Sequence, residues 1–200
     1  KTIACFGSGE GKPGDPMYDA MQEVGRLLAE RGHTVATGGF GGIGMEAPCR
    51  GARMAGGNTI GYTFGGKHAN EFVVEVENCL AKYGVIGPRG VYDPPVERQY
   101  GIRLGNLLTA DAFVIAATGD LGTMVECLAV FNLNAKLWNP PKRIALLHCA
   151  AFPVEKELIA EMELAKTLPI EMEHPVLHFT TSPAQAVGWV LGDEAVVSTW

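Results

Sequence analysis

The sequence predicts an α/β fold, a single-domain, Rossmann-like, doubly wound parallel sheet with helices on both faces. Two observations predict this class. Short apolar stretches of strand length alternate with longer stretches whose apolar residues recur at helical spacing, and glycine-rich turns follow several of the short stretches. Parallel strands need long connections, usually helices, so this alternation indicates a parallel sheet. No repeat or linker divides the chain, and residues 1–200 are expected to form one domain.

The first half of the chain supplies three strands and two helices. Asp15-Pro16 predicts the start of the first helix, because aspartate is a favoured N-cap residue and proline is favoured in the first turn. Arg31-Gly32 is expected to end that helix. The second helix carries residues 45–54. Strands are expected at residues 2–6, 33–37 and 59–63.

The second half continues the alternation after a stretch rich in glycine and turn residues, 64–93, in which only residues 72–76 look extended. Asn139-Pro140-Pro141 is expected to break the chain before a strand, and Ser182-Pro183 to begin the last helix. The remaining elements are expected as helices at about 95–109, 122–137 and 154–165 and as strands at 112–117, 143–147 and 176–179.

Composition excludes several classes of function. Apolar residues at 47% and charged residues at 19% describe a soluble globular protein, expected in the cytoplasm. A net charge of -6 without a dense Lys/Arg stripe argues against a nucleic-acid partner, and no apolar stretch approaches the roughly 20 residues that span a membrane. The five cysteines are scattered without metal-ligand spacing, so no metal site or disulfide framework is expected.

Three glycine-rich loops follow the first, second and fourth predicted strands, at residues 7–14, 38–44 and 118–123. In open sheets of this class, ligands bind in the crevice where the strand order reverses, and these loops are expected to converge there. Each loop alone is equally consistent with a tight turn. The chain has no Walker-type phosphate loop, and Gly7-Ser8-Gly9 lacks the third glycine of a dinucleotide fingerprint.

The third loop carries the most chemistry. Backbone N–H groups at Gly119, Gly122 and Thr123 would stand at the positive end of a helix, which suits an anion. Glu126 lies one turn further along and would face the same ligand. The alternative for Glu126 is stabilisation of the helix dipole, worth about 0.3–1 kcal/mol. The alternative for Arg103, on the preceding helix, is a solvated surface cation.

Several of these residues fall in the order and spacing of a known superfamily. They are Gly38-Gly39, the run Gly44-Met45-Glu46-Ala47-Pro48 with Gly51-Ala52, Arg103, and Gly122-Thr123-x-x-Glu126. The chain resembles the Rossmann-like LOG (Lonely Guy) superfamily, whose members are often labelled "lysine decarboxylases". The resemblance covers about residues 2 to 150. It is nearest the nucleoside-monophosphate nucleosidases and the molybdenum-cofactor carrier-like proteins.

This resemblance implies hydrolysis of the N-glycosidic bond of a nucleoside 5′-monophosphate, with Arg103 and Glu126 as catalytic residues and neither metal nor organic cofactor. The alternative is a binding or carrier protein for a nucleotide or a molybdopterin-type phosphate ligand. The implied partners are this small molecule and a second copy of the chain in a homodimer. The phosphate or nucleotide would contact Ser8, Gly9, Gly38, Gly39, Gly119, Asp120, Gly122 and Thr123.

The chain departs from the superfamily's PGGxGTxxE loop at two positions. Thr118 stands in place of proline and Asp120 in place of the second glycine. A carboxylate about 4 Å from a phosphate would repel it by up to about 4 kcal/mol at an effective dielectric constant of about 20. Asp120 is therefore expected to weaken phosphate binding. Because it alters the loop most associated with catalysis, it also favours the carrier alternative.

Overall fold

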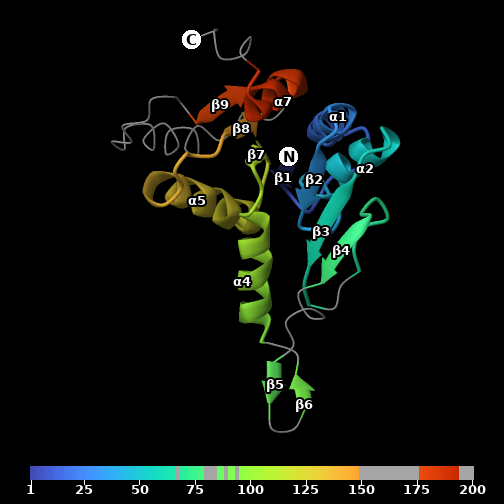
Figure 1. The fold of residues 1–200 in the computed structure, drawn as a ribbon. Helices are drawn as coiled ribbons and strands as arrows, with labels where there is room; N and C mark the ends of the chain where they lie inside the picture. Colours follow the sequence, from blue (N-terminus) through green and yellow to red (C-terminus); the bar gives the residue numbers. More distant parts are fainter. Residues whose placement is uncertain (66–67, 79–84, 88–89, 93–94, 149–175, 194–200) are drawn as a thin grey trace.

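The computed structural model describes residues 1–65, 68–78, 85–87, 90–92, 95–148 and 176–193. Seven parallel strands form one sheet in the order β4-β3-β2-β1-β7-β8-β9, which confirms the predicted α/β, Rossmann-like class (Figure 1). The strands are β1 (Thr2–Phe6), β2 (Thr34–Thr37), β3 (Thr59–Thr63), β4 (Glu75–Asn78), β7 (Ala112–Ala116), β8 (Ile144–Leu147) and β9 (Leu177–Thr180).

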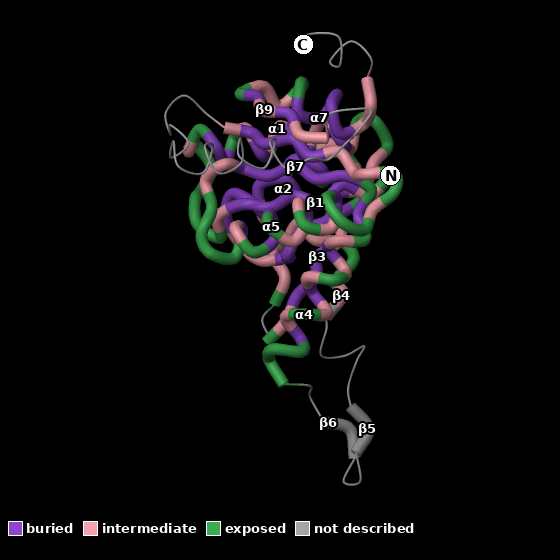
Figure 2. The backbone as a smooth tube through the Cα atoms, turned by 90° about the vertical axis from the view of Figure 1, so that its left-hand side faces the viewer, coloured by how far each residue is buried: buried purple, intermediate pink, exposed green. Residues whose placement is uncertain are grey.

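Helices cover both faces of this sheet because alternate strand residues point to opposite sides. Buried residues of α1, α2 and α7 pack with Ile3, Cys5 and Val114 on one face. Buried residues of α4 and α5 pack with Ala4 and Phe113 on the other. The helices are α1 (Pro16–Glu30), α2 (Glu46–Met54), α4 (Val96–Leu107), α5 (Leu121–Lys136) and α7 (Pro183–Leu191). Figure 2 shows β1 and β7 buried between these layers, and the end of α4 remote from the sheet exposed.

The strand order reverses between β1 and β7. The chain proceeds from β1 outward through β2 and β3 to β4, then returns to place β7 on the other side of β1. Phe6 at the end of β1 is in register with Ile115, one residue before the end of β7. The loops that leave these two strands therefore start side by side, and this is the position at which open α/β sheets bind ligands.

Strand β4 begins later than its sequence predicts. Residues 72–76 were expected to be extended, but the ladder with β3 starts at Glu75, opposite Ile60. Before that point the side chain of Thr59 holds the backbone: its hydroxyl donates to the carbonyl of Phe72 (2.7 Å) and accepts from the N–H of Val74 (2.9 Å). The hydroxyl takes the place of backbone hydrogen bonds between the two strands at this point, so the regular pairing of β4 with β3 runs only from Glu75 to Asn78.

The other predicted elements agree with the structure within about two residues at each end wherever the structure describes them. Ser182 caps α7 as expected, accepting from the N–H of Gln185 (3.3 Å). Asp15 occupies the N-cap position of α1, but its carboxylate accepts from the N–H of Lys12 instead. An antiparallel hairpin, β5 (Val85–Gly87) with β6 (Gly90–Tyr92), was not expected, and it projects beyond the start of α4 (Figure 1). The helix predicted at 154–165 lies outside the described residues.

Candidate functional site

The two predicted catalytic residues meet in a buried ion pair. Arg103 on α4 donates from Nη1 to Oε1 of Glu126 on α5 over 3.0 Å. Both residues are buried, with exposed fractions of 6% and 7%. A second bond, from Nε to the carbonyl of Tyr62 on β3 (3.0 Å), fixes the plane of the guanidinium. Arg103 is therefore not a solvated surface cation, and Glu126 does more than stabilise a helix end.

Gly38 makes room for this arginine. A Cβ atom at Gly38 would lie 1.7 Å from Nη2 of Arg103 and 2.8 Å from Sδ of Met45, so a larger residue there would displace the guanidinium. The rings of Phe40 and Phe64 lie 5.9 and 5.5 Å from the guanidinium carbon and enclose it further. The cation–π contacts stabilise the guanidinium, and the exclusion of water strengthens its attraction to Glu126.

Burial changes the acidity of Glu126. Desolvation, the largest cause, raises the pKa of the carboxyl above its ordinary value of 4.5. The Arg103 charge and its hydrogen bond oppose this shift, and the negative charge of Asp120 adds to it, with a net upward result. A carboxylate whose pKa is shifted toward neutrality is a better general base than an ordinary glutamate.

Tyr100, which was not predicted as a site residue, lies one helical turn before Arg103 on α4. Burial raises the pKa of its phenol, and the charges of Glu126 and Asp120 raise it further while Arg103 lowers it. Its ring meets Phe64 edge-on, with centroids 5.8 Å apart. The spacing of three residues between Tyr100 and Arg103 places both side chains on one face of α4, and this spacing was the available signal.

The N-terminus of α5 is capped from within the loop. Oδ1 of Asp120 accepts hydrogen bonds from the N–H groups of Gly122 (2.9 Å) and Thr123 (3.2 Å). These are two of the amides that were expected to bind phosphate. Asp120 occupies both of them in this structure, and their role in ligand binding stays a prediction. A Cβ at Gly119 would lie 2.4 Å from Cβ of Thr123, so this glycine allows the loop to fold onto the helix.

Two hydroxyl groups beside this cap are unused. The side-chain oxygens of Thr118 and Thr123 are buried, and neither has a hydrogen-bond partner in the part of the chain that the structure describes. A buried hydroxyl left without a partner costs about 1–3 kcal/mol, so each of these two groups is available to pair with water or a ligand. The predicted contribution of Thr123 to ligand binding is compatible with this position, and no contact tests it.

The loop that follows β1 joins the other two loops. The N–H of Ser8 donates to the carbonyl of Thr118 (3.0 Å), and the carbonyl of Ser8 accepts from the N–H of Gly44 (3.0 Å). Gly9 and Gly42 are in close backbone contact, since a Cβ at Gly42 would lie 2.2 Å from the carbonyl carbon of Gly9. The expected convergence of the three loops is therefore present. Ligand binding by Ser8, Gly9, Gly38 and Gly39 stays a prediction.

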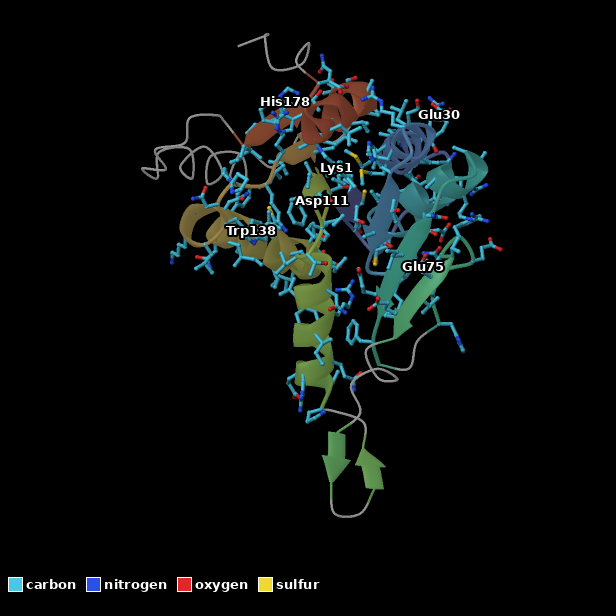
Figure 3. All side chains as sticks on the ribbon, viewed as in Figure 1. Lys1, Glu30, Glu75, Asp111, Trp138 and His178 are labelled. Atoms are coloured by element: carbon cyan, nitrogen blue, oxygen red, sulfur yellow. The ribbon has the colours of Figure 1, made fainter. Side chains whose placement is uncertain are left out.

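The C-terminal end of α4 is held by hydrogen bonds to the segment after α5. Nζ of Lys142 donates to the carbonyls of Leu108 (2.9 Å) and Ala110 (2.7 Å), just beyond the end of α4. The same ammonium lies 4.3 Å from the ring centroid of Trp138, which stacks on Phe113 of β7. Figure 3 labels Trp138 beside α5. These contacts fix the relative placement of α4 and α5, and with it the geometry of the ion pair that joins them.

Two kinds of site are not found in the described ranges. No three His, Cys, Asp or Glu side chains there gather closely enough to hold a metal ion. None of the helices described has the length and apolar composition that crossing a bilayer requires.

A model of the SLOG cluster4 family matches residues 1–168. A curated relative, an uncharacterized protein from Archaeoglobus fulgidus, is 43% identical over 52 residues, which are 26% of this chain and 34% of that protein. The chain thus matches about a third of the length of this relative.

Three solved structures share the fold. The crystal structure of the protein TM1055 is 21% identical with a TM-score of 0.65, covering 96% of this chain and 98% of that chain. The molybdenum cofactor carrier protein from Chlamydomonas reinhardtii is 20% identical with a TM-score of 0.60, covering 97% and 98%. DNA processing protein A from Helicobacter pylori, solved for its single-stranded DNA binding mode, is 14% identical with a TM-score of 0.61, covering 96% and 80%. At these identities the likeness concerns the fold alone.

Proposed function

The chain belongs to the SLOG cluster4 family, and on this premise we propose that it binds a nucleotide-type small molecule at the carboxyl ends of β1 and β7 and hydrolyses its N-glycosidic bond. The observation that carries the proposal is the buried Arg103–Glu126 pair, with 3.0 Å between Nη1 and Oε1. A buried carboxylate of raised pKa beside a fixed cation, at the topological switch point, is the arrangement expected of an acid–base site.

Hydrolysis requires stabilisation of positive charge on the sugar. The bond between the anomeric carbon and the base nitrogen breaks, its electron pair leaves with the base, and the ribosyl group becomes oxocarbenium-like. The Glu126 carboxylate stabilises this charge and accepts a proton from water as the water oxygen bonds to the anomeric carbon. The proton then passes to the departing base nitrogen, so the products are the free base and the sugar.

Arg103 acts mainly by positioning Glu126. Its Nε and Nη1 donors are engaged by the Tyr62 carbonyl and the carboxylate. Because Arg103 binds Oε1, the other carboxylate oxygen is the one presented to water. The predicted contact between Arg103 and a phosphate or ribose hydroxyl would have to use Nη2, which lies toward Gly38 and Met45.

The substrate implied by the resemblance is a nucleoside 5′-monophosphate, which would yield a free base and ribose 5-phosphate. The chemistry at the anomeric carbon does not depend on that phosphate. Hydrolysis by Glu126 and recognition of the 5′ group are therefore separate parts of the proposal, each tested by itself.

A second candidate is binding without turnover, as in a carrier. The observation in its favour is Asp120, which departs from the loop that the resemblance associates with catalysis and whose Oδ1 binds two amides of that loop. The solved structure of a molybdenum cofactor carrier protein shows that this fold occurs in a protein of that kind. The homodimer implied by the resemblance is proposed for either function.

A base-release assay separates the two candidates. The protein is incubated with a panel of nucleosides and their 5′-monophosphates, and free base is measured for wild type and Glu126→Gln. Glutamine keeps an oxygen that accepts from Arg103 but cannot take a proton, so we expect base release to fall by about 10²–10⁴-fold. Glu97→Gln, which removes an exposed carboxylate of the same helix as Arg103, should leave the rate unchanged.

The outcomes of this assay are distinct. Base release by Glu126→Gln at the wild-type rate would show that Glu126 is not the catalytic carboxylate. A rise in Tm on adding one of the compounds, with no base released by wild type, would establish the carrier in place of the hydrolase.

A further inference from the structure

We propose that Asp120 determines ligand specificity by occupying the amide donors at the start of α5, so that the site takes a nucleoside rather than a nucleoside 5′-monophosphate. This inference rests on the proposed function for the class of ligand, a ribosylated base. It adds which form of that ligand the site accepts. The juxtaposition behind it is a carboxylate, two amides and two unused hydroxyls in one turn of the chain.

Two of the three amides expected to bind an anion at this helix end, those of Gly122 and Thr123, are already used. An anion at a helix N-terminus binds through the first free N–H groups, where the helix dipole is positive. In this chain the Asp120 carboxylate accepts from the N–H groups of both Gly122 and Thr123. It does so as the N-cap residue of a helix of 16 residues, with extended backbone angles (φ -93°, ψ -170°). A phosphate at this position would have to displace a side chain that is covalently tethered to the loop.

Asp120 also acts on the catalytic pair through its charge. Its negative charge contributes to the raised pKa of both Glu126 and Tyr100, which places it within electrostatic range of the two side chains. Asp120 itself is exposed, and its Oδ2 has no hydrogen-bond partner among the described residues. That oxygen can accept a hydrogen bond from a neutral donor. A sugar hydroxyl supplies such a donor, whereas an ionised phosphate supplies only acceptors.

The unused hydroxyls point to the same ligand chemistry. Thr118 and Thr123 each hold a buried oxygen without a partner in the described part of the chain, one on each side of Asp120. A hydroxyl both donates and accepts, so it can pair with a sugar hydroxyl or a base edge. The turn therefore offers a ligand one acceptor and two hydroxyls, whereas the amides of Gly122 and Thr123 are already bound to Asp120.

Occupancy and simple charge repulsion predict different outcomes for two variants. Asparagine caps helices as well as aspartate does, so Asp120→Asn removes the charge and keeps the donors occupied. Glycine is also tolerated at an N-cap, so Asp120→Gly frees both donors at little cost in stability. If occupancy decides, only the glycine variant gains phosphate binding. If charge alone decides, both variants gain it.

The first experiment uses inorganic phosphate as the probe and Tm as the readout. We expect phosphate at about a hundredfold above its Kd to raise the Tm of Asp120→Gly by about 5 °C or more. Wild type and Asp120→Asn should shift by less than about 1 °C at the same concentration. Glu71→Gln, which removes an exposed carboxylate elsewhere and changes the net charge equally, should behave as wild type. A shift in wild type or in Asp120→Asn equal to that of Asp120→Gly would overturn the proposal.

The second experiment measures kcat/KM for one nucleoside and for its 5′-monophosphate. Wild type should prefer the nucleoside, and Asp120→Gly should change the ratio toward the monophosphate by about tenfold or more, since a good charge-assisted contact is worth that factor. An unchanged ratio would contradict the inference. If neither compound is hydrolysed, the proposed hydrolase fails, yet the phosphate titration still decides the role of Asp120. The two failures are therefore distinguishable.

Discussion

Two regions meet at the reversal of strand order, and they are held together in different ways. The first consists of the loops after β1 and β2, residues 7–14 and 38–44, which are joined by backbone hydrogen bonds and close glycine contacts. The second consists of α4, α5 and the loop between β7 and α5. It is joined by side chains: the Arg103–Glu126 pair and the Asp120 cap.

The difference shows where ligand chemistry resides. In the first region backbone groups bind one another, as Ser8 does with Thr118 and Gly44, and glycines such as Gly42 allow the loops to pack closely. The second region contains a buried ion pair, Arg103–Glu126, that joins α4 to α5. The loop before α5 adds an exposed carboxylate, Asp120, and two hydroxyls without a partner among the described residues. We infer that the first region is the frame of the site and that the second region binds and transforms the ligand.

The largest expected effect breaks the second region at its ion pair. Arg103→Met leaves Glu126 buried without its cation, and we expect a loss of about 3–5 kcal/mol in the free energy of unfolding at neutral pH. The measurement is urea denaturation. The double variant Arg103→Met/Glu126→Gln should recover most of this loss, because no buried charge remains. Equal losses in the single and double variants would show that the pair is not energetically coupled.

The same variant has a defined pH dependence. The folded-state pKa of Glu126 lies above its ordinary value of 4.5, so folding favours the protonated carboxyl. The stability from this group is fully present below about pH 4.5 and is lost as the pH rises through the folded-state pKa. Removing Arg103 raises that pKa further. The deficit of Arg103→Met should therefore shrink as the pH is lowered toward 4.5, and a deficit that grew would contradict the assignment.

The next effect tests whether the first region serves the second. Gly38→Ala would place Cβ 1.7 Å from Nη2 of Arg103, so the guanidinium must shift away from residue 38, and we expect its bond to Glu126 to be strained. We expect a loss of about 1–3 kcal/mol by overpacking, together with a fall in base release. Gly41→Ala is a matched control in the same loop, since its Cβ would be 3.7 Å from the nearest atom, Oε2 of Glu46. Equal stability losses in the two variants would show that Gly38 has no special role beside Arg103.

The frame was more predictable from sequence than the site. Buried parallel strands such as β1 and β7 are continuous apolar runs, and the helices between them carry a clear period, so their order follows from pattern. The hairpin β5–β6 was missed because its strands have three residues each, too few to show an alternation. The start of β4 was displaced by a single side chain, Thr59, whose hydroxyl bonds no pattern reveals.

The site was predicted in part. Arg103 and Glu126 were identified by resemblance, and their contact depends on the packing of α4 against α5, which spacing along the chain does not specify. Asp120 was interpreted as an added charge, although an aspartate directly before a helix is also a strong N-cap signal. Tyr100 was missed because no motif includes it.

The smallest expected effect concerns a side chain of the first region, which the comparison treats as the frame of the site. Ser8 lies in the first region and is half-buried. Among the described residues, its hydroxyl accepts from the N–H of Glu10 (3.0 Å) and has no other partner. Ser8→Ala should therefore cost no more than about 0.5–1 kcal/mol in urea denaturation, since both partners of that bond remain hydrated. If Ser8 also binds the ligand, as the resemblance implies, KM should rise with stability almost unchanged. A large loss of stability would show that side chains hold the first region too, and the distinction between frame and site would then be wrong.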